Sequence, residues 1–157
     1  MSAATYGPLE LQSFVAQFYD GAKLTMVPFA YPATFGPLNP GATLNQIVTI
    51  AANADFLLLA IHHHATIAAA AQTVSSKTAP CVRLLITDTG SSESFTNAPA
   101  DLENYGQNDA KPNSLPFPRL IGGLTSLNVQ VTSFAAAEIY NPLEIYLEGV
   151  RIRKLNQ

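Results

Sequence analysis

The sequence predicts an all-β fold: an antiparallel β-sandwich with a jelly roll as its topology, preceded by a short N-terminal helix or arm. Apolar and polar residues alternate at 127–132 and again at 143–148, as in strands with one buried face. Prolines and glycines separate the apolar segments, and no helical period follows residue 20. Such spacing predicts a sandwich of about seven or eight strands, with immunoglobulin topology as the structural alternative.

The first twenty residues differ from the rest of the chain. Four apolar side chains recur there with helical spacing: Leu11, Phe14, Val15 and Phe18. Pro8 suits the first helical turn, so the chain divides into a helix or arm at 1–20 and a sandwich domain at 21–157. Two interpretations of the helix stay open. It folds back on its own sheet, or it docks on a neighbouring subunit with Phe14 and Phe18 at the interface.

The next strands are predicted from proline positions and apolar runs. Four prolines between residues 23 and 40 restrict that segment to edge strands and extended loops. A first regular strand is expected at 44–51, and residues 56–61 are apolar on both faces, as in a central strand covered on each side. Another strand at 81–87 would bury Cys81, and residues 98–113 have the composition of a surface loop.

The two alternating segments near the C-terminus, 127–132 and 143–148, are expected to pair as a long antiparallel hairpin. At Gly149 the apolar positions change from odd to even, which predicts a bulge or bend. Arg151 and Arg153 would then point away from the core.

Composition limits the classes of function. Only 12% of the 157 residues are charged and the net charge is −3, without a polybasic surface, so we expect no nucleic-acid partner. We also expect no standard secretion signal and no membrane anchor, since the longest apolar run is short. Low charge suits a subunit of an assembly, and a polar all-β domain accounts for it equally well.

One motif has the form of an active-site turn. Asp88-Thr89-Gly90-Ser91 follows an apolar strand and resembles the turn of pepsin-like and retroviral aspartic proteases, which need two such aspartates and hence a homodimer here. The simpler interpretation is a tight turn, with Asp88 accepting from local amides and Gly90 at positive φ.

Three consecutive histidines raise the possibility of a metal site. On a strand, His62 and His64 share one face and His63 faces oppositely, so one chain offers too few ligands unless a symmetry axis adds more. Polar residues at a strand end are the favoured interpretation. The acidic cluster Asp101, Glu103 and Asp109 is likewise read as a solvated loop rather than a calcium site. No catalytic, cofactor-binding or metal-binding residue is therefore predicted, and no enzyme.

The order of several short segments carries a family resemblance. The segments are 52–56, 68–74, 85–91, 97–99, 115–119, 127–132 and 147–152. Together, over about residues 42–153, they resemble a group of small virion structural proteins of tailed bacteriophages. The N-terminal helix and the histidine run depart from that pattern.

The resemblance implies a capsid decoration or cement protein. Such a protein is made in the host cytoplasm, ends in the virion, binds the major capsid protein and itself, as a homotrimer, and needs no cofactor. Arg151 and Arg153 are then the expected contacts to the shell or a neighbouring subunit. The alternatives are a neck or tail protein, or a receptor- or glycan-binding module that uses aromatic side chains: Tyr105, Phe117, Tyr140 and Tyr146. A homodimeric protease using Asp88 is the remote alternative.

Overall fold

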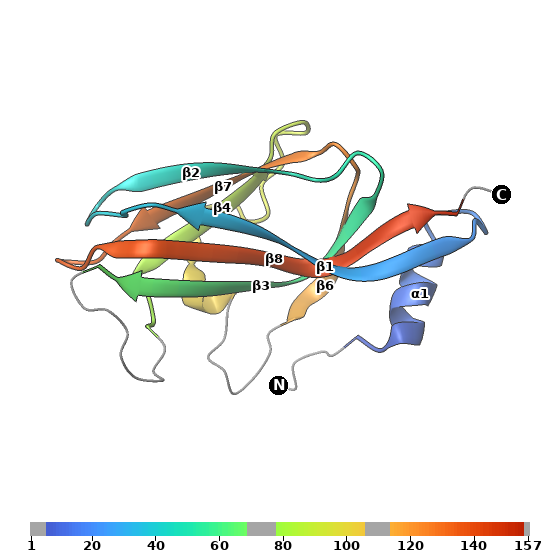
Figure 1. The fold of residues 1–157 in the computed structure, drawn as a ribbon, viewed down its shortest axis with the longest axis horizontal. Helices are drawn as coiled ribbons and strands as arrows, with labels where there is room; N and C mark the ends of the chain where they lie inside the picture. Colours follow the sequence, from blue (N-terminus) through green and yellow to red (C-terminus); the bar gives the residue numbers. More distant parts are fainter. Residues whose placement is uncertain (1–5, 69–77, 106–113, 156–157) are drawn as a thin grey trace.

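The computed structural model describes residues 6–68, 78–105 and 114–155. These residues form one α-helix, one short 3-10 helix and eight strands. Figure 1 shows how these elements are arranged. Their bounds are α1 (Pro8–Ala16), β1 (Leu24–Phe35), β2 (Thr43–Thr49), β3 (Asp55–Ile67), β4 (Val82–Asp88), β5 (Ala100–Asp101), η1 (Leu102–Asn104), β6 (Ser114–Ile121), β7 (Ser126–Ser133) and β8 (Tyr140–Lys154).

The strands form two antiparallel sheets. The first sheet has the order β1-β8-β3-β6 and the second has the order β2-β7-β4-β5. β1 pairs with β8, β2 with β7, β3 with β6 and β4 with β5, as in a long hairpin rolled up into a sandwich. This is jelly-roll topology, so the predicted all-β sandwich is confirmed and the immunoglobulin alternative is wrong.

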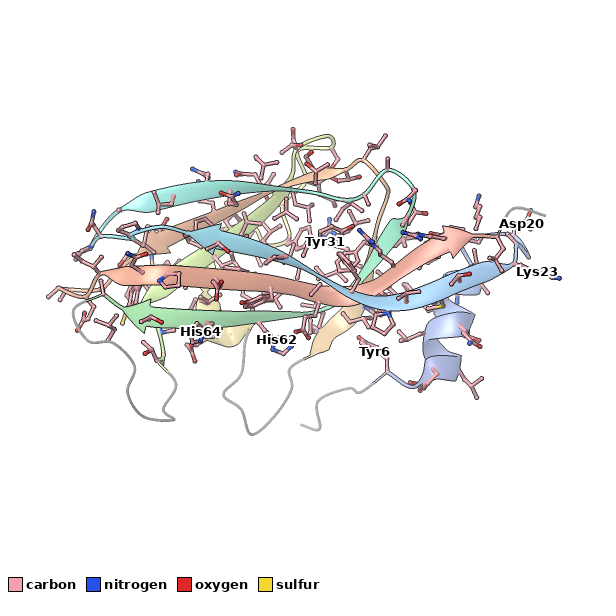
Figure 2. All side chains as sticks on the ribbon, in the orientation of Figure 1. Tyr6, Asp20, Lys23, Tyr31, His62 and His64 are labelled. Carbon is pink, nitrogen blue, oxygen red and sulfur yellow. The ribbon has the colours of Figure 1, made fainter. Side chains whose placement is uncertain are left out.

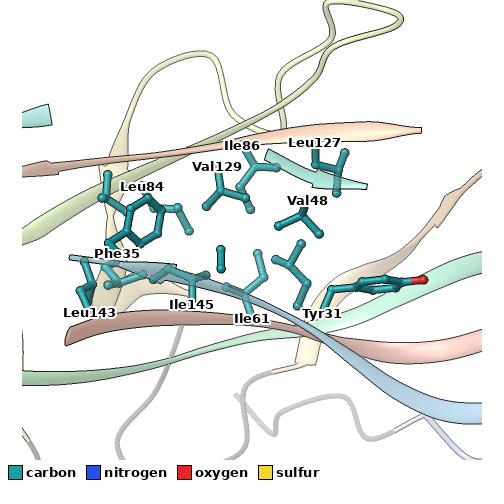
Figure 3. Packing of buried hydrophobic residues seen from close by; sticks show 14 of the residues in the cluster. Tyr31, Phe35, Val48, Ile61, Leu84, Ile86, Leu127, Val129, Leu143 and Ile145 are labelled. Carbon is teal, nitrogen blue, oxygen red and sulfur yellow. The ribbon is translucent and has the colours of Figure 1, made fainter. Parts of the chain in front are cut away.

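The main core lies between the two sheets. Leu84 and Ile86 of β4 and Val129 of β7 face Phe35 and Ile145 of the first sheet, and each of these side chains is at most 3% exposed (Figure 3). Burial alternates strictly along β7, so the period-2 pattern in the sequence identified its inner face correctly.

A second, smaller core lies on the outer face of the first sheet. α1 covers this face beside the ends of β1 and β8 (Figure 1). The buried members of the cluster are Val15, Tyr19, Leu57, Val150 and Ile152. In the single chain the helix therefore packs on its own sheet, as the first of the two interpretations expected.

The predicted C-terminal hairpin is wrong. The segments 127–132 and 143–148 do form strands, but β7 lies in the second sheet and β8 in the first. Alternation fixes which side chains of a strand are buried and says nothing about which strand is its neighbour. Each segment instead pairs with partners far away in the sequence, and the connection between them crosses from one sheet to the other.

The predicted bulge at Gly149 is also misplaced. β8 pairs with β1 in one continuous register from Leu24↔Lys154 to Phe35↔Leu143, and the irregularity lies across from Gly149, in β3 between Leu58 and Ala60. The apolar positions of β8 change parity because the covered face changes. Its first half faces the sandwich core, and its last residues face α1 on the other side of the sheet.

Three smaller predictions concern the strand at 56–61, the burial of Cys81 and the backbone of Gly90. Residues 56–61 do form a strand covered on both faces, with Phe56 in the main core and Leu57 beneath the helix. Cys81 was expected to be buried, and it is exposed, because β4 begins one residue later. The positive φ predicted for Gly90 belongs instead to Ser92, at 59°.

Candidate interaction surface

The first sheet is longer than the second at the end that carries α1. β1 and β8 run together past the end of the second sheet (Figure 1), so one face of this extension lies against α1 and the other has no sheet opposite it. Strand alternation places Val27, Phe29, Arg151 and Arg153 on that uncovered face, which we call the extension face. Val27 is 49% exposed and Phe29 is 36% exposed, so the face offers apolar area next to cationic groups.

Arg151 is held flat on the extension face. Its guanidinium carbon lies 3.6 Å from the centre of the Phe29 ring, a cation–π contact, and its Nε and Nη2 lie 3.4 Å from the Tyr31 hydroxyl oxygen. That oxygen also accepts from the Ala51 amide at 3.1 Å. Arg151 lies on the face opposite the buried Val150 and Ile152, as expected, and aromatic side chains at the end of the sandwich stack with it. Arg153 is exposed, as expected.

Phe14 and Phe18 lie on the opposite side of the same extension, on and just after α1. The two rings are 5.3 Å apart, and the Phe14 ring lies 5.7 Å from that of Phe117 on β6. Phe18 is 54% exposed and Phe117 is 73% exposed. We call these three side chains the aromatic cluster. An exposed cluster of this kind is typical of a contact surface, and Phe117 joins it only because the fold brings β6 beside the helix.

The segment between α1 and β1 is fixed to the sheet by polar contacts. The Tyr19 hydroxyl donates to Asp55 Oδ2, while Asp55 Oδ1 accepts from the Gly123 amide at 2.8 Å. Burial, followed by the hydrogen bond to Asp55, raises the pKa of Tyr19. Asp55 thus connects the segment after α1, the start of β3 and the turn before β7, and these contacts attach the end that carries the aromatic cluster to the sheet.

The histidine run divides between the two faces of β3, as predicted. His62 and His64 lie on the outer face (Figure 2), where His62 Nε2 is 3.1 Å from Glu148 Oε2. His63 points inward, is 5% exposed, and its Nε2 lies 2.7 Å from Glu103 Oε1 on η1. Within the described ranges of one chain, no three His, Cys, Asp or Glu side chains gather as a metal site would require.

The acidic loop residues have structural contacts. Asp101 Oδ1 caps η1 by accepting from the Glu103 amide at 3.1 Å, and Glu103 connects η1 to β3 through His63. Asp109, the third member of the predicted acidic cluster, lies outside the described residues, as do residues 69–74 of the resemblance.

Asp88 forms the tight turn of the simpler interpretation. Its Oδ1 accepts from the amides of Gly90 at 2.8 Å and Ser91 at 3.2 Å. These two hydrogen bonds, the one from Ser91 first, lower the pKa of Asp88. A carboxylate stabilised in its charged form by its own turn differs from the proton-sharing pair of an aspartic protease.

The four aromatic residues of the receptor-binding alternative do not form one surface. Tyr140 is 2% exposed, and its hydroxyl oxygen accepts from the Cys81 amide at 2.9 Å, so it is a core residue and the expectation of a contact role is wrong. Tyr146 donates to Glu144, and Tyr105 packs against the main core. Of the four, Phe117 is the one that the aromatic cluster presents to solvent.

Comparisons with known proteins add no relative: no protein-family model, curated protein or solved structure matches the chain. Across the residues that the structure describes, no helix has the length and apolar character needed to cross a membrane.

Proposed function

We propose that this protein is a non-enzymatic structural protein of a tailed-bacteriophage virion that decorates the capsid and cements it. The resemblance in the order of the short sequence segments indicates this class of protein. The observation that carries the proposal is the α1 end of the first sheet, where the extension face and the aromatic cluster present apolar and cationic side chains on a rigid frame. A contact surface of exposed aromatic and arginine side chains is typical of protein–protein interfaces.

The mechanism is binding linkage. A subunit that binds only the expanded shell stabilises that state by its binding free energy, and many copies add their contributions against the pressure of the packaged DNA. The partners are the major capsid protein and, once bound to the shell, other copies of this chain in a homotrimer. Arg153 would meet acidic groups of the shell, and Phe18 and Phe117 would bury apolar area against it.

Copy number in purified virions tests the proposal most directly. Quantitative mass spectrometry against the major capsid protein should find on the order of hundreds of copies, as a protein repeated over the shell requires. About a dozen copies or fewer would overturn the cement role in favour of the neck or tail, where the ring symmetries are low.

Two charge-reversal variants test whether the extension face makes the proposed contact. Arg153→Glu should lower occupancy on particles by about tenfold or more, because it reverses an exposed charge at the proposed contact. Arg83→Glu makes the same change on the second sheet, far from α1, and should leave occupancy unchanged. Equal retention of both variants, with unchanged melting temperatures, would contradict the assignment of this surface.

The exposed Phe117 favours a second candidate, a receptor- or glycan-binding module of the virion. In that case Phe117→Ser would abolish adsorption to host cells while the protein stayed on the particle. Under the cement proposal the same substitution should weaken retention on the particle and leave adsorption unchanged.

A further inference from the structure

Three of the four outer strands of the sandwich are closed to further strand pairing. β1 carries Pro28 and Pro32, and β6 carries Pro116 and Pro118. Proline has no N–H to give to a neighbour, so in a paired strand its nitrogen faces the free edge and interrupts it. β5, at the outside of the second sheet, has only two residues.

β2 is the exception. It has seven residues and pairs with β7 without a break from Thr43↔Thr132 to Thr49↔Ser126. Its sequence contains no proline, no glycine and no charged residue. In the described part of the chain it pairs with β7 alone, although long, regular edge strands usually carry a charge, a proline or a bulge that prevents association.

The hydrogen-bond pattern identifies which groups of β2 are available. At the two ends of the ladder, Ser133 N donates to Ala42 O at 3.0 Å and Ile50 N donates to Thr125 O at 2.9 Å. Even positions therefore bond inward to β7, and antiparallel alternation turns the N–H and C=O groups of the odd positions outward. These odd positions are Thr43, Asn45, Ile47 and Thr49.

We propose that β2 is a self-association site, at which β2 of a second copy of this chain adds antiparallel across a twofold axis at Gln46. In this register Thr43 faces Thr49 of the second copy and Asn45 faces Ile47, so every outward residue belongs to a hydrogen-bonded pair that exchanges two bonds. The contact joins two four-stranded second sheets into one continuous sheet.

Three of the four kinds of side-chain pair in this register match like with like, and the exception is Asn45, which faces Ile47. Leu44 meets Val48 of the second copy at the close, non-hydrogen-bonded positions, where cross-strand aliphatic contact is strongest, and Gln46 meets its own copy on the axis. Threonines face threonines at both ends, and no charge opposes another. The order of residue types in β2 is thus similar in both directions. This favours a second copy as the partner, because an unrelated strand would not require β2 to match itself.

The site goes beyond the proposed function and does not rest on it. β2 belongs to the second sheet, whereas α1, the extension face and the aromatic cluster belong to the first. A pair formed through β2 therefore uses other residues than the proposed shell-binding end.

Sedimentation velocity of the purified full chain over a concentration series tests the inference. The wild-type protein should associate reversibly to twice the mass of the 16.7 kDa chain. Gln46→Lys places like charges directly opposite each other on the axis and should weaken association by about tenfold or more. Gln17→Lys, the same change at the exposed end of α1, should have no effect.

Two further variants make the test specific. An equimolar mixture of Gln46→Lys and Gln46→Glu should recover the pair as a heterodimer, because opposite charges then meet on the axis. Ile47→Pro removes an outward N–H without removing a bond to β7, and it should abolish association while the chain stays folded. A wild-type chain that is monomeric up to its solubility limit would overturn the inference. So would an oligomer insensitive to Gln46→Lys, which would leave the edge to another partner.

Discussion

Of the described glycines, Gly149 has the least room for a side chain. It lies in the middle of β8, opposite the irregularity of β3. A methyl group added there would overlap the carbonyl oxygen of Leu57, and it would lie 2.9 Å from the Leu57 carbonyl carbon and 3.0 Å from the ring of Phe56. Two of these three atoms belong to the backbone, so the substitution Gly149→Ala requires the central strand pair to move apart.

The cost can be worked from this geometry. Forcing one extra carbon into a well-packed interior costs about 1–3 kcal/mol, and rigid backbone neighbours favour the upper end. For a chain of this size each kcal/mol lowers the melting temperature by about 2–4 °C, so Gly149→Ala should lower it by about 6–12 °C. The assay is thermal and urea unfolding followed by circular dichroism, with the free energy of unfolding as the quantity compared.

Gly36→Ala is the matched control. Gly36 lies outside the left-handed region, and no other atom lies within 4 Å of the added methyl group. This substitution should be neutral, or stabilising by up to about 1 kcal/mol, because alanine restricts the unfolded chain. If Gly149→Ala instead melts within 1 °C of the wild-type protein, the close approach of β3 and β8 is not what requires glycine at this position.

Two further substitutions test polar contacts. Tyr19→Phe removes the hydrogen bond to Asp55 and should cost about 1–2 kcal/mol. Because the folded pKa of Tyr19 is raised, its contribution is complete below about pH 10 and is lost as the pH rises further, so urea unfolding of the variant should show a shallower alkaline loss of stability. Asp88→Asn should destabilise at pH 7, and its effect should shrink as the pH falls below about 3.9, the ordinary aspartate pKa, because the amides of Ser91 and Gly90 lower the pKa of Asp88. Wild-type and Asp88→Asn proteins should be equally inactive in peptide cleavage at acid pH, and activity abolished by the substitution would restore the protease alternative.

The sequence predicted the fold class correctly because its signals are local. Alternation identified the inner faces of β7 and β8, and prolines identified β1 as an edge. Strand partners could not be predicted in this way. The pairing of β2 with β7 depends on the fold of the whole chain and produces no local pattern in the sequence. The short strand β5 contains too few residues to produce a pattern at all.

The candidate surface was predictable in part. Helical spacing placed Phe14, Val15 and Phe18 on one apolar face. In the structure Val15 is buried and Phe18 is 54% exposed, a difference that the spacing does not predict. The contact with Phe117 could not be predicted, because it joins residues about a hundred positions apart. The contact of Arg151 with an aromatic ring of the neighbouring strand could not be predicted either, because it depends on the register of β1 and β8.

The change of covered face along β8 explains why α1 belongs to this domain. Its first half contributes to the sandwich, and its last residues, Val150 and Ile152, need α1 as their cover. The helix is therefore part of this domain's core, and its exposed aromatic side chains lie on a fixed base rather than on a loose arm. A partner that binds there meets a surface formed before binding, which avoids the entropic cost of ordering a segment.

The open edge of β2 is equally preformed, since its hydrogen-bonding groups are aligned by β7. The two proposed contacts, with a copy through the second sheet and with a shell through the first, therefore use different sheets, and neither requires a rearrangement of the sandwich.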